Sequence, residues 1–225
     1  MARLPPIRSG RRGRRGRRPF ASRPLRKRFL IVCEGEVTEV AYFEAFPVNR
    51  EVKVVVEGEG KNTTSLVSAA VEHADRAPTP FDEVWVVYDH DDFGAHRFNR
   101  ANADIRALDA SPKRSERWVA AWSNQAFEVW YLLHFQFFDG KLHRHLVQDK
   151  LGDLLRSQLG HVSGYRKNDP RLYALLRPLQ AQAIKHARRL VELHGVGGHT
   201  RTTPAEANPC TMVFRLVEAL NDQIQ

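Results

Sequence analysis

Apolar runs of strand length alternate with amphipathic segments through the first part of the chain. Four short apolar or β-branched runs predict strands over residues 28–33, 52–56, 84–88 and 118–122. Apolar residues at helical spacing predict helices over residues 38–46, 63–74, 97–108 and 125–135. Strands that alternate with helices are typical of an α/β sheet, mostly parallel, with helices on its faces.

From residue 141 onward the pattern becomes helical. The apolar spacing predicts helices over residues 143–159, 170–193 and 209–221, and Asp169-Pro170 is a favourable helix start. We therefore divide the chain into a basic tail without regular structure, an α/β core, and a helical C-terminal extension packed on that core. These three parts span residues 1–28, 29–140 and 141–225.

Positive charge is concentrated at the N-terminus. The net charge is +9, but residues 1–28 contain twelve Lys or Arg and no acid, which leaves 23 basic and 26 acidic residues elsewhere. Gly and Pro among these arginines block regular structure. Two interpretations stay open: an arm that neutralises phosphates, or a solvated tail that aids solubility. The candidate nucleic-acid-binding residues are Arg11, Arg12, Arg14, Arg15, Arg17 and Arg18.

Acidic residues follow the first and third predicted strands. Glu34 comes directly after residues 28–33, and Asp89 and Asp91 follow residues 84–88. Parallel strands place their carboxyl ends at the same edge of a sheet, where ligands bind in open α/β folds. We therefore expect these three carboxylates to converge, although they are far apart in the sequence.

Converging carboxylates indicate a divalent cation. Such groups repel one another, and their pKa values rise unless a cation neutralises them. Mg²⁺ prefers oxygen ligands, with Mn²⁺ as an alternative occupant. Gly35 lets the backbone turn tightly beside the ion. The alternative is that these acids cap the next helix, but two acidic clusters that each follow an apolar strand favour a metal site.

The same segments resemble the Toprim domain of primases, topoisomerases and overcoming-lysogenization-defect nucleases, in which one strand leads into Glu-Gly and a later strand into Asp-x-Asp. More narrowly, the chain resembles the RloB/AbiLii family of prokaryotic defence proteins. The segments that carry this resemblance are residues 31–39, 42–43, 86–91, 123–135, 165–167 and 208–211. It implies an α/β fold with a Toprim-like, mostly parallel sheet flanked by helices and a C-terminal helical extension.

The resemblance also implies Mg²⁺-dependent chemistry at Glu34, Asp89 and Asp91. It implies a nuclease encoded beside an ATPase and active in abortive infection, with tRNA as an expected target. Two departures from the family pattern matter. The family has Asn-Pro where this chain has Asn124-Gln125, and Glu39 stands one residue later than the matching acid in the related nucleases. The role of Glu39 as a ligand is therefore in doubt.

Two further residues are secondary candidates for catalysis. Glu128 follows the fourth predicted strand and is either a ligand or supporting residue of the metal site, or a first-turn glutamate favoured by the helix dipole. Lys167 is either a cation that neutralises the transition-state phosphate or a solvated loop lysine.

We expect a cytoplasmic, Mg²⁺-dependent endonuclease, with RNA favoured over DNA, that acts as the effector of an antiphage system. We expect an ATPase partner and no membrane association, and a homo-oligomer is compatible with the sequence. The alternative is a non-catalytic sensor or regulatory subunit that binds nucleic acid through the tail. The two differ in whether the protein turns over nucleic acid when metal is supplied.

Overall fold

The structure is a computed structural model that describes residues 27–47, 52–56, 63–90, 94–141, 143–196 and 202–224. For residues 52–56 and 63–64 it describes the backbone only. The candidate ligand Asp91 and the six tail arginines lie outside the described residues.

The described chain forms one five-stranded sheet in the order β2-β1-β3-β4-β5. The first four strands are parallel, and β5 pairs antiparallel with β4. The strands are β1 (Phe29–Cys33), β2 (Val52–Val56), β3 (Glu83–Asp89), β4 (Arg117–Asn124) and β5 (Cys210–Thr211). The expected α/β class with a mostly parallel sheet is confirmed.

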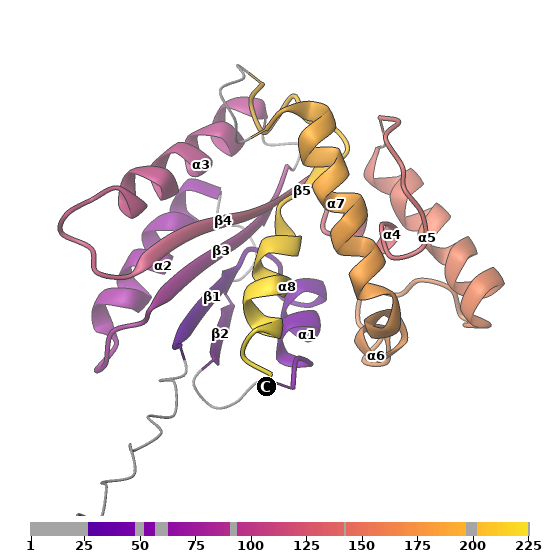
Figure 1. Cartoon of the computed structure of the whole chain (residues 1–225), viewed down its shortest axis with the longest axis horizontal. Coiled ribbons are helices and arrows are strands. Elements are labelled where there is room, and N and C mark those ends of the chain that lie inside the picture. The colour runs from indigo at the N-terminus through magenta and orange to yellow at the C-terminus, as the bar shows by residue number, and fades with distance from the viewer. Residues whose placement is uncertain are drawn as a thin grey trace, which may run out of the picture.

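Helices cover both faces of this sheet (Figure 1). α2 (Thr63–Arg76) and α3 (Ala95–Asp109) pack on one face, and α1 (Thr38–Glu44) and α8 (Val213–Asn221) lie on the other. The remaining helices lie toward the side where β4 ends: α4 (Glu128–Leu132), α5 (Arg144–Leu159), α6 (Leu172–Leu176) and α7 (Gln180–His194). No helix within the described ranges is both long and apolar enough to cross a bilayer.

The core forms where the central strands meet these helices. β1 is buried along its whole length, and β3 is buried up to Tyr88, as expected for central strands covered on both faces. Three large indole side chains are fully buried: Trp85 on β3, Trp122 on β4 and Trp130 on α4. This packing fixes the carboxyl ends of β1 and β3 against α4 and so positions the acidic residues that follow them.

The structure corrects three predicted elements. The helix expected over 170–193 is split into α6, a 3₁₀ turn (Arg177–Leu179) and α7. Pro178 lies in that turn, because a proline in a helix interior removes a backbone hydrogen bond and clashes with the preceding turn. The helix expected over 125–135 is regular only over α4, and that over 209–221 begins with the strand β5 before α8.

Asp169 does not cap a helix, although Asp169-Pro170 is a favourable helix start in the sequence. α6 begins at Leu172, with Arg171 as the flanking residue. The Asp169 carboxylate accepts a hydrogen bond from the Arg171 backbone N–H at 2.9 Å and lies 2.7 Å from Nε2 of His161. These contacts stabilise the loop before α6 rather than the helix start.

Candidate metal and nucleic-acid site

The ends of β1 and β3 bring Glu34 and Asp89 together. The parallel register pairs Cys33 with Val87, and the Glu34 N–H continues the ladder to the Val87 carbonyl at 2.9 Å. Oε2 of Glu34 then accepts a hydrogen bond from the backbone N–H of Asp89 at 3.2 Å. Both side chains are half-buried, so they are fixed at the sheet edge and still accessible to a ligand.

The Asp89 carboxylate connects β3 to α4. Its Oδ2 accepts a hydrogen bond from the backbone N–H of Phe127 at 2.9 Å, at the residue that precedes α4. A carboxylate that accepts backbone N–H groups is held in one orientation, because those donors cannot move independently of the fold. Asp89 therefore occupies a defined position between the sheet and the C-terminal helices.

Glu128 is the third described acid at this edge. It lies at the start of α4 and is only 4% exposed, so its polar atoms need partners within the protein. Its Oε1 accepts hydrogen bonds from the Tyr165 hydroxyl and from Nε2 of Gln148, each at 2.8 Å. Burial and the neighbouring Glu128 carboxylate raise the pKa of Tyr165 well above its ordinary value, so this phenol remains a proton donor.

Glu39 belongs to the same group of acids. Burial raises its pKa to about 7, and the nearby carboxylates of Glu128 and Glu34 add to the shift. A Cβ atom on Gly35 would overlap the Glu39 carboxylate, so the missing side chain at position 35 makes room for this acid. The sequence leaves the ligand role of Glu39 in doubt, and the structure places its carboxylate near those of Glu34 and Glu128.

Lys167 supplies positive charge beside this cluster. Its side chain is exposed, and its charge lowers the pKa of Glu39 in opposition to the neighbouring acids. Its carbonyl oxygen lies 3.5 Å from the Thr38 hydroxyl, which places the loop that carries Lys167 beside the start of α1. The structure thus brings Lys167 close to the acidic edge, and a catalytic role for it stays a prediction.

The donor chemistry of this edge fits a hard divalent cation. Glu34 and Asp89 offer carboxylate oxygens, which Mg²⁺ prefers. Burial is the main cause of the raised pKa of Glu39, and the smaller contribution from the carboxylates of Glu128 and Glu34 is of the kind that a cation relieves. Among the described residues, no three His, Cys, Asp or Glu are arranged to hold a metal ion. Asp91, the third expected ligand, lies outside those residues.

Three features of this site could not be named from the sequence. Gln148 and Tyr165 hold Glu128, and the Phe127 N–H holds Asp89, through contacts between distant segments. Tyr165 and Phe127 lie in segments that carry the family resemblance, residues 165–167 and 123–135, whereas Gln148 has no such signal.

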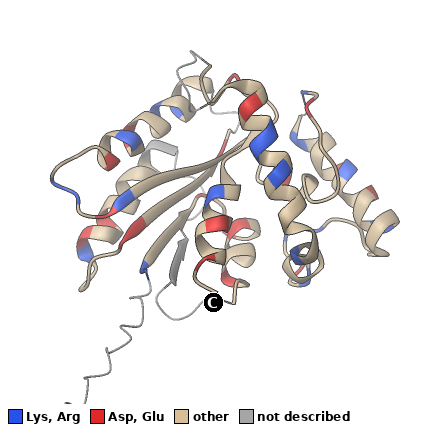
Figure 2. Ribbon diagram, viewed as in Figure 1, with Lys and Arg blue, Asp and Glu red and all other residues tan. Residues whose placement is uncertain are grey.

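Basic residues in the described part of the chain do not mark a single binding face. Figure 2 shows Lys and Arg distributed over several helices, including α3, α5 and α7. Because the six tail arginines are not described, a nucleic-acid-binding role for them stays a prediction.

Comparison with known proteins gives one match. A family model described as RloB-like protein matches residues 29–220, which is most of the chain. Neither the curated proteins nor the solved structures contain a match.

Proposed function

We propose that this chain, which belongs to the RloB-like family, is a Mg²⁺-dependent nuclease whose active site lies at the carboxyl ends of β1, β3 and β4. One observation carries the proposal: the Glu34 carboxylate meets the Asp89 backbone at 3.2 Å, so two acids from separate strands share one edge. Carboxylates gathered at this position of an α/β sheet are typical of a metal-assisted site.

Glu34 and Asp89, together with Asp91, would hold the cation, which is Mg²⁺ or Mn²⁺. A bound divalent cation supplies the polarisation of a phosphodiester and the activation of a water molecule. The chain's own contribution is orientation, because the Phe127 N–H fixes Asp89 and the Asp89 N–H fixes Glu34 before any ligand arrives.

Two further residues would act around the ligands. Lys167, exposed beside the acids, would bind the phosphate whose negative charge increases during the reaction. Glu128 would act as a buried supporting residue behind the metal ligands, since Tyr165 and Gln148 hold its carboxylate in one orientation.

RNA, and tRNA in particular, is the proposed substrate, with the tail arginines as its first contact. The proposal includes a cytoplasmic effector of antiphage abortive infection, released from control by an ATPase partner. Support comes from membership of the RloB-like family and from the twelve basic residues among residues 1–28. A homo-oligomer is compatible with this arrangement.

The experiment is incubation of the full chain with total tRNA and with plasmid DNA, in Mg²⁺ and in EDTA. We expect cleavage of tRNA in Mg²⁺ alone, and none by Asp89→Asn. The matched control is Asp82→Asn at the opposite end of β3, where the carboxylate also accepts a backbone N–H, from Arg28 at 2.6 Å.

Absence of cleavage with every nucleic acid, while tRNA still binds, would overturn the nuclease proposal. That result would favour a non-catalytic sensor or regulatory subunit of a defence complex. Equal cleavage by Asp89→Asn and the unchanged chain would instead place the activity at another site or in a contaminant.

A further inference from the structure

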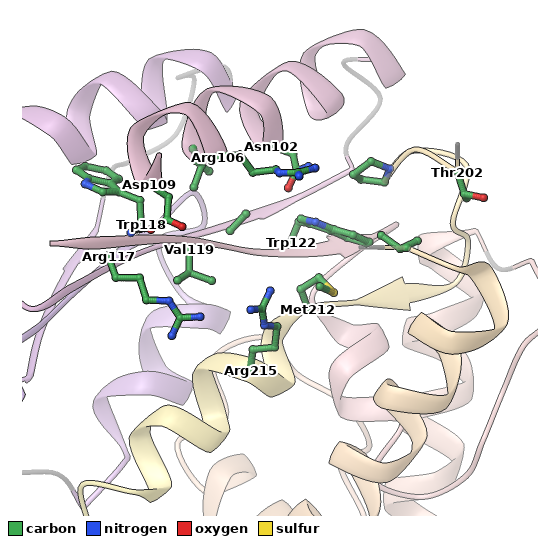
Figure 3. A pocket seen from close by; sticks show the side chains of 14 residues that line it. Asn102, Arg106, Asp109, Arg117, Trp118, Val119, Trp122, Thr202, Met212 and Arg215 are labelled. Carbon is green, nitrogen blue, oxygen red and sulfur yellow. Dashed lines mark hydrogen bonds between the residues drawn. The ribbon is translucent and has the colours of Figure 1, made fainter. Parts of the chain in front are cut away.

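A pocket of about 300 Å³ opens at the outer edge of β4, away from the acidic cluster. α3, β4 and the start of α8 form its walls, and Trp118, Trp122 and Met212 contribute apolar surface (Figure 3). The pocket runs along β4 from Arg117 to Trp122, whereas the proposed nuclease site adjoins the Asn124 end.

Three arginines from three different elements line this pocket. Arg106 comes from α3, Arg117 from the start of β4 and Arg215 from α8. Within the described part of the chain, none of the three forms an ion pair or a side-chain hydrogen bond. Arg100 and Arg188, by contrast, each bind a carboxylate directly, that of Asp104 and that of Glu218. The three guanidinium groups are therefore available to a ligand.

Arg117 and Arg215 extend from different elements toward the same space (Figure 3). Burial lowers the pKa of Arg215, and the charge of Arg117 lowers it further, while Asp109 and Glu218 act in the opposite direction. These two acids already have partners: Asp109 accepts the Trp118 N–H at 2.9 Å, and Glu218 binds Arg188 at 2.6 Å. Asp109 also lines the pocket and keeps its negative charge, so three arginines there face one carboxylate and positive charge is in excess.

The backbone of β4 adds hydrogen-bonding groups to the pocket. β4 pairs with β5 only at Ser123 and Asn124, and the Met212 N–H bonds the Trp122 carbonyl at 2.8 Å. Since the Arg117 N–H bonds toward β3, alternation along the strand directs the N–H and C=O of Ala120 toward the outer edge. The pocket thus combines arginines with a backbone donor and acceptor.

We propose that this pocket binds a phosphate-bearing ligand with at least two negative charges. Guanidinium groups match phosphate oxygens through paired hydrogen bonds. Arg117 and Arg215 extend toward the same space on one side of β4 and repel each other unless an anion lies between them, while Arg106 lines the pocket from the side of α3. A volume of about 300 Å³ admits a pyrophosphate group or a small nucleotide and excludes a duplex. The phosphate belongs either to a free nucleotide or to one strand of RNA.

The experiment measures binding to the full chain in EDTA at constant ionic strength, so that no cutting occurs. The ligands are inorganic pyrophosphate, a nucleoside diphosphate and a short single-stranded RNA. Their binding is measured by calorimetry and by the shift in the Tm of the protein. The test variant is Arg117→Gln with Arg215→Gln. The charge-matched control is Arg76→Gln with Arg100→Gln, because each of these arginines binds a carboxylate within its own helix, outside the pocket.

We expect pyrophosphate or the diphosphate to raise the Tm of the wild type and the control by a few degrees. The test variant should lose about tenfold or more in affinity, and Arg106→Gln alone should lose less. If RNA affinity falls in the test variant while neither small ligand binds, the phosphate comes from nucleic acid.

Two results would overturn the proposal. One is that no phosphate ligand shifts the wild type at concentrations up to several millimolar. The other is that the test variant and the control bind alike. Self-association of the test variant without any loss of phosphate binding would show instead that the arginines only keep the open strand edge from pairing. The nuclease assay is separate, so failure here leaves the proposed activity unaffected.

Discussion

The acidic edge beside the Asn124 end of β4 and the arginine pocket along its outer edge gather like charges in different ways. At the acidic edge, every described strand-end acid has a fixed donor: Asp89 binds the Phe127 N–H, and Glu34 binds the Asp89 N–H. In the pocket, Arg106, Arg117 and Arg215 have no such acceptor in the described part of the chain. The fold orients the acids before a ligand binds and leaves the arginines to be oriented by the ligand.

This difference separates two kinds of binding. Backbone donors that hold a carboxylate limit its movement, which suits a site where reacting atoms must be placed accurately. Long side chains without partners keep their rotamer freedom until a ligand binds, which suits recognition of a charged group and costs entropy at that moment. The two regions should therefore respond independently to substitution and to ligands.

The largest effect is expected from Asp89→Asn. The change removes one negative charge and keeps an oxygen to accept the Phe127 N–H, so the fold should persist. We expect tRNA cleavage to fall about 1,000-fold or more, because an amide neither balances nor holds a divalent cation as a carboxylate does. The measurement is a cleavage rate in Mg²⁺, accompanied by the pyrophosphate-induced Tm shift, which should stay unchanged.

The reciprocal variant completes the comparison. Arg117→Gln with Arg215→Gln should lose the Tm shift and retain cleavage of a short RNA. A loss of both properties in either variant would show that the acidic edge and the arginine pocket are coupled, and independence of the two regions would have to be abandoned.

Much of the sheet follows from the sequence alone. The pattern predicts the strand over residues 52–56 with the observed bounds, and that over residues 28–33 begins one residue before β1, since continuous apolar or β-branched runs are typical of covered strands. β5 was missed because a strand of two residues has no measurable alternation. The prediction of a continuous helix over 170–193 is wrong, and Pro178 is the residue in the sequence that signals the break.

The candidate site, like the fold, can be predicted from the sequence only in part. The meeting of Glu34 and Asp89 follows from strand order, because acids that end neighbouring parallel strands share an edge. The partners of Glu128 do not follow from it. Gln148 and Tyr165 reach Glu128 from segments 20 and 37 residues away, and only the packing of α5 and its following loop decides that contact.

A buried histidine makes the free energy of unfolding depend on pH, with an effect of intermediate size. Because it concerns the whole fold, it would affect the acidic edge and the arginine pocket together. Burial lowers the pKa of His134 to about 4, and its ring nitrogen Nδ1 lies 2.9 Å from the Trp130 carbonyl. In the unfolded chain His134 binds a proton near pH 6.5, whereas in the folded chain it does so only near pH 4. The free energy of unfolding is therefore highest above pH 6.5 and falls as the pH decreases toward 4. The full loss is roughly 3 kcal/mol.

Urea unfolding at pH 7 and pH 5 measures this effect. His134→Gln should narrow the difference in unfolding free energy between the two pH values, whereas His145→Gln, at an exposed position, should leave it unchanged. Equal pH profiles for the wild type and His134→Gln would contradict the assignment. Activity and phosphate binding should therefore be compared at pH 7 or above, where this effect is absent.

Gly35→Ala tests how closely the acids pack. The new methyl group would overlap the Glu39 carboxylate, which must then move within the acidic edge. We expect a destabilisation of roughly 2 kcal/mol that largely disappears in a Glu39→Ala background, because the clash depends on both residues. Gly152→Ala is the control, since a methyl group there meets only ordinary contacts. Equal costs of Gly35→Ala in both backgrounds would exclude this explanation.

The smallest effect is expected from Tyr165→Phe, which asks whether the C-terminal part of the chain holds the acidic edge in place. The substitution removes one of two hydrogen bonds to Oε1 of Glu128 and leaves that from Gln148. We expect a loss of about 1 kcal/mol in unfolding free energy. Tyr173→Phe should cost nothing comparable, because the buried Tyr173 hydroxyl has no hydrogen-bond partner within the described chain. If both variants cost the same, Tyr165 contributes only its ring, and the orientation of Glu128 depends on Gln148 alone.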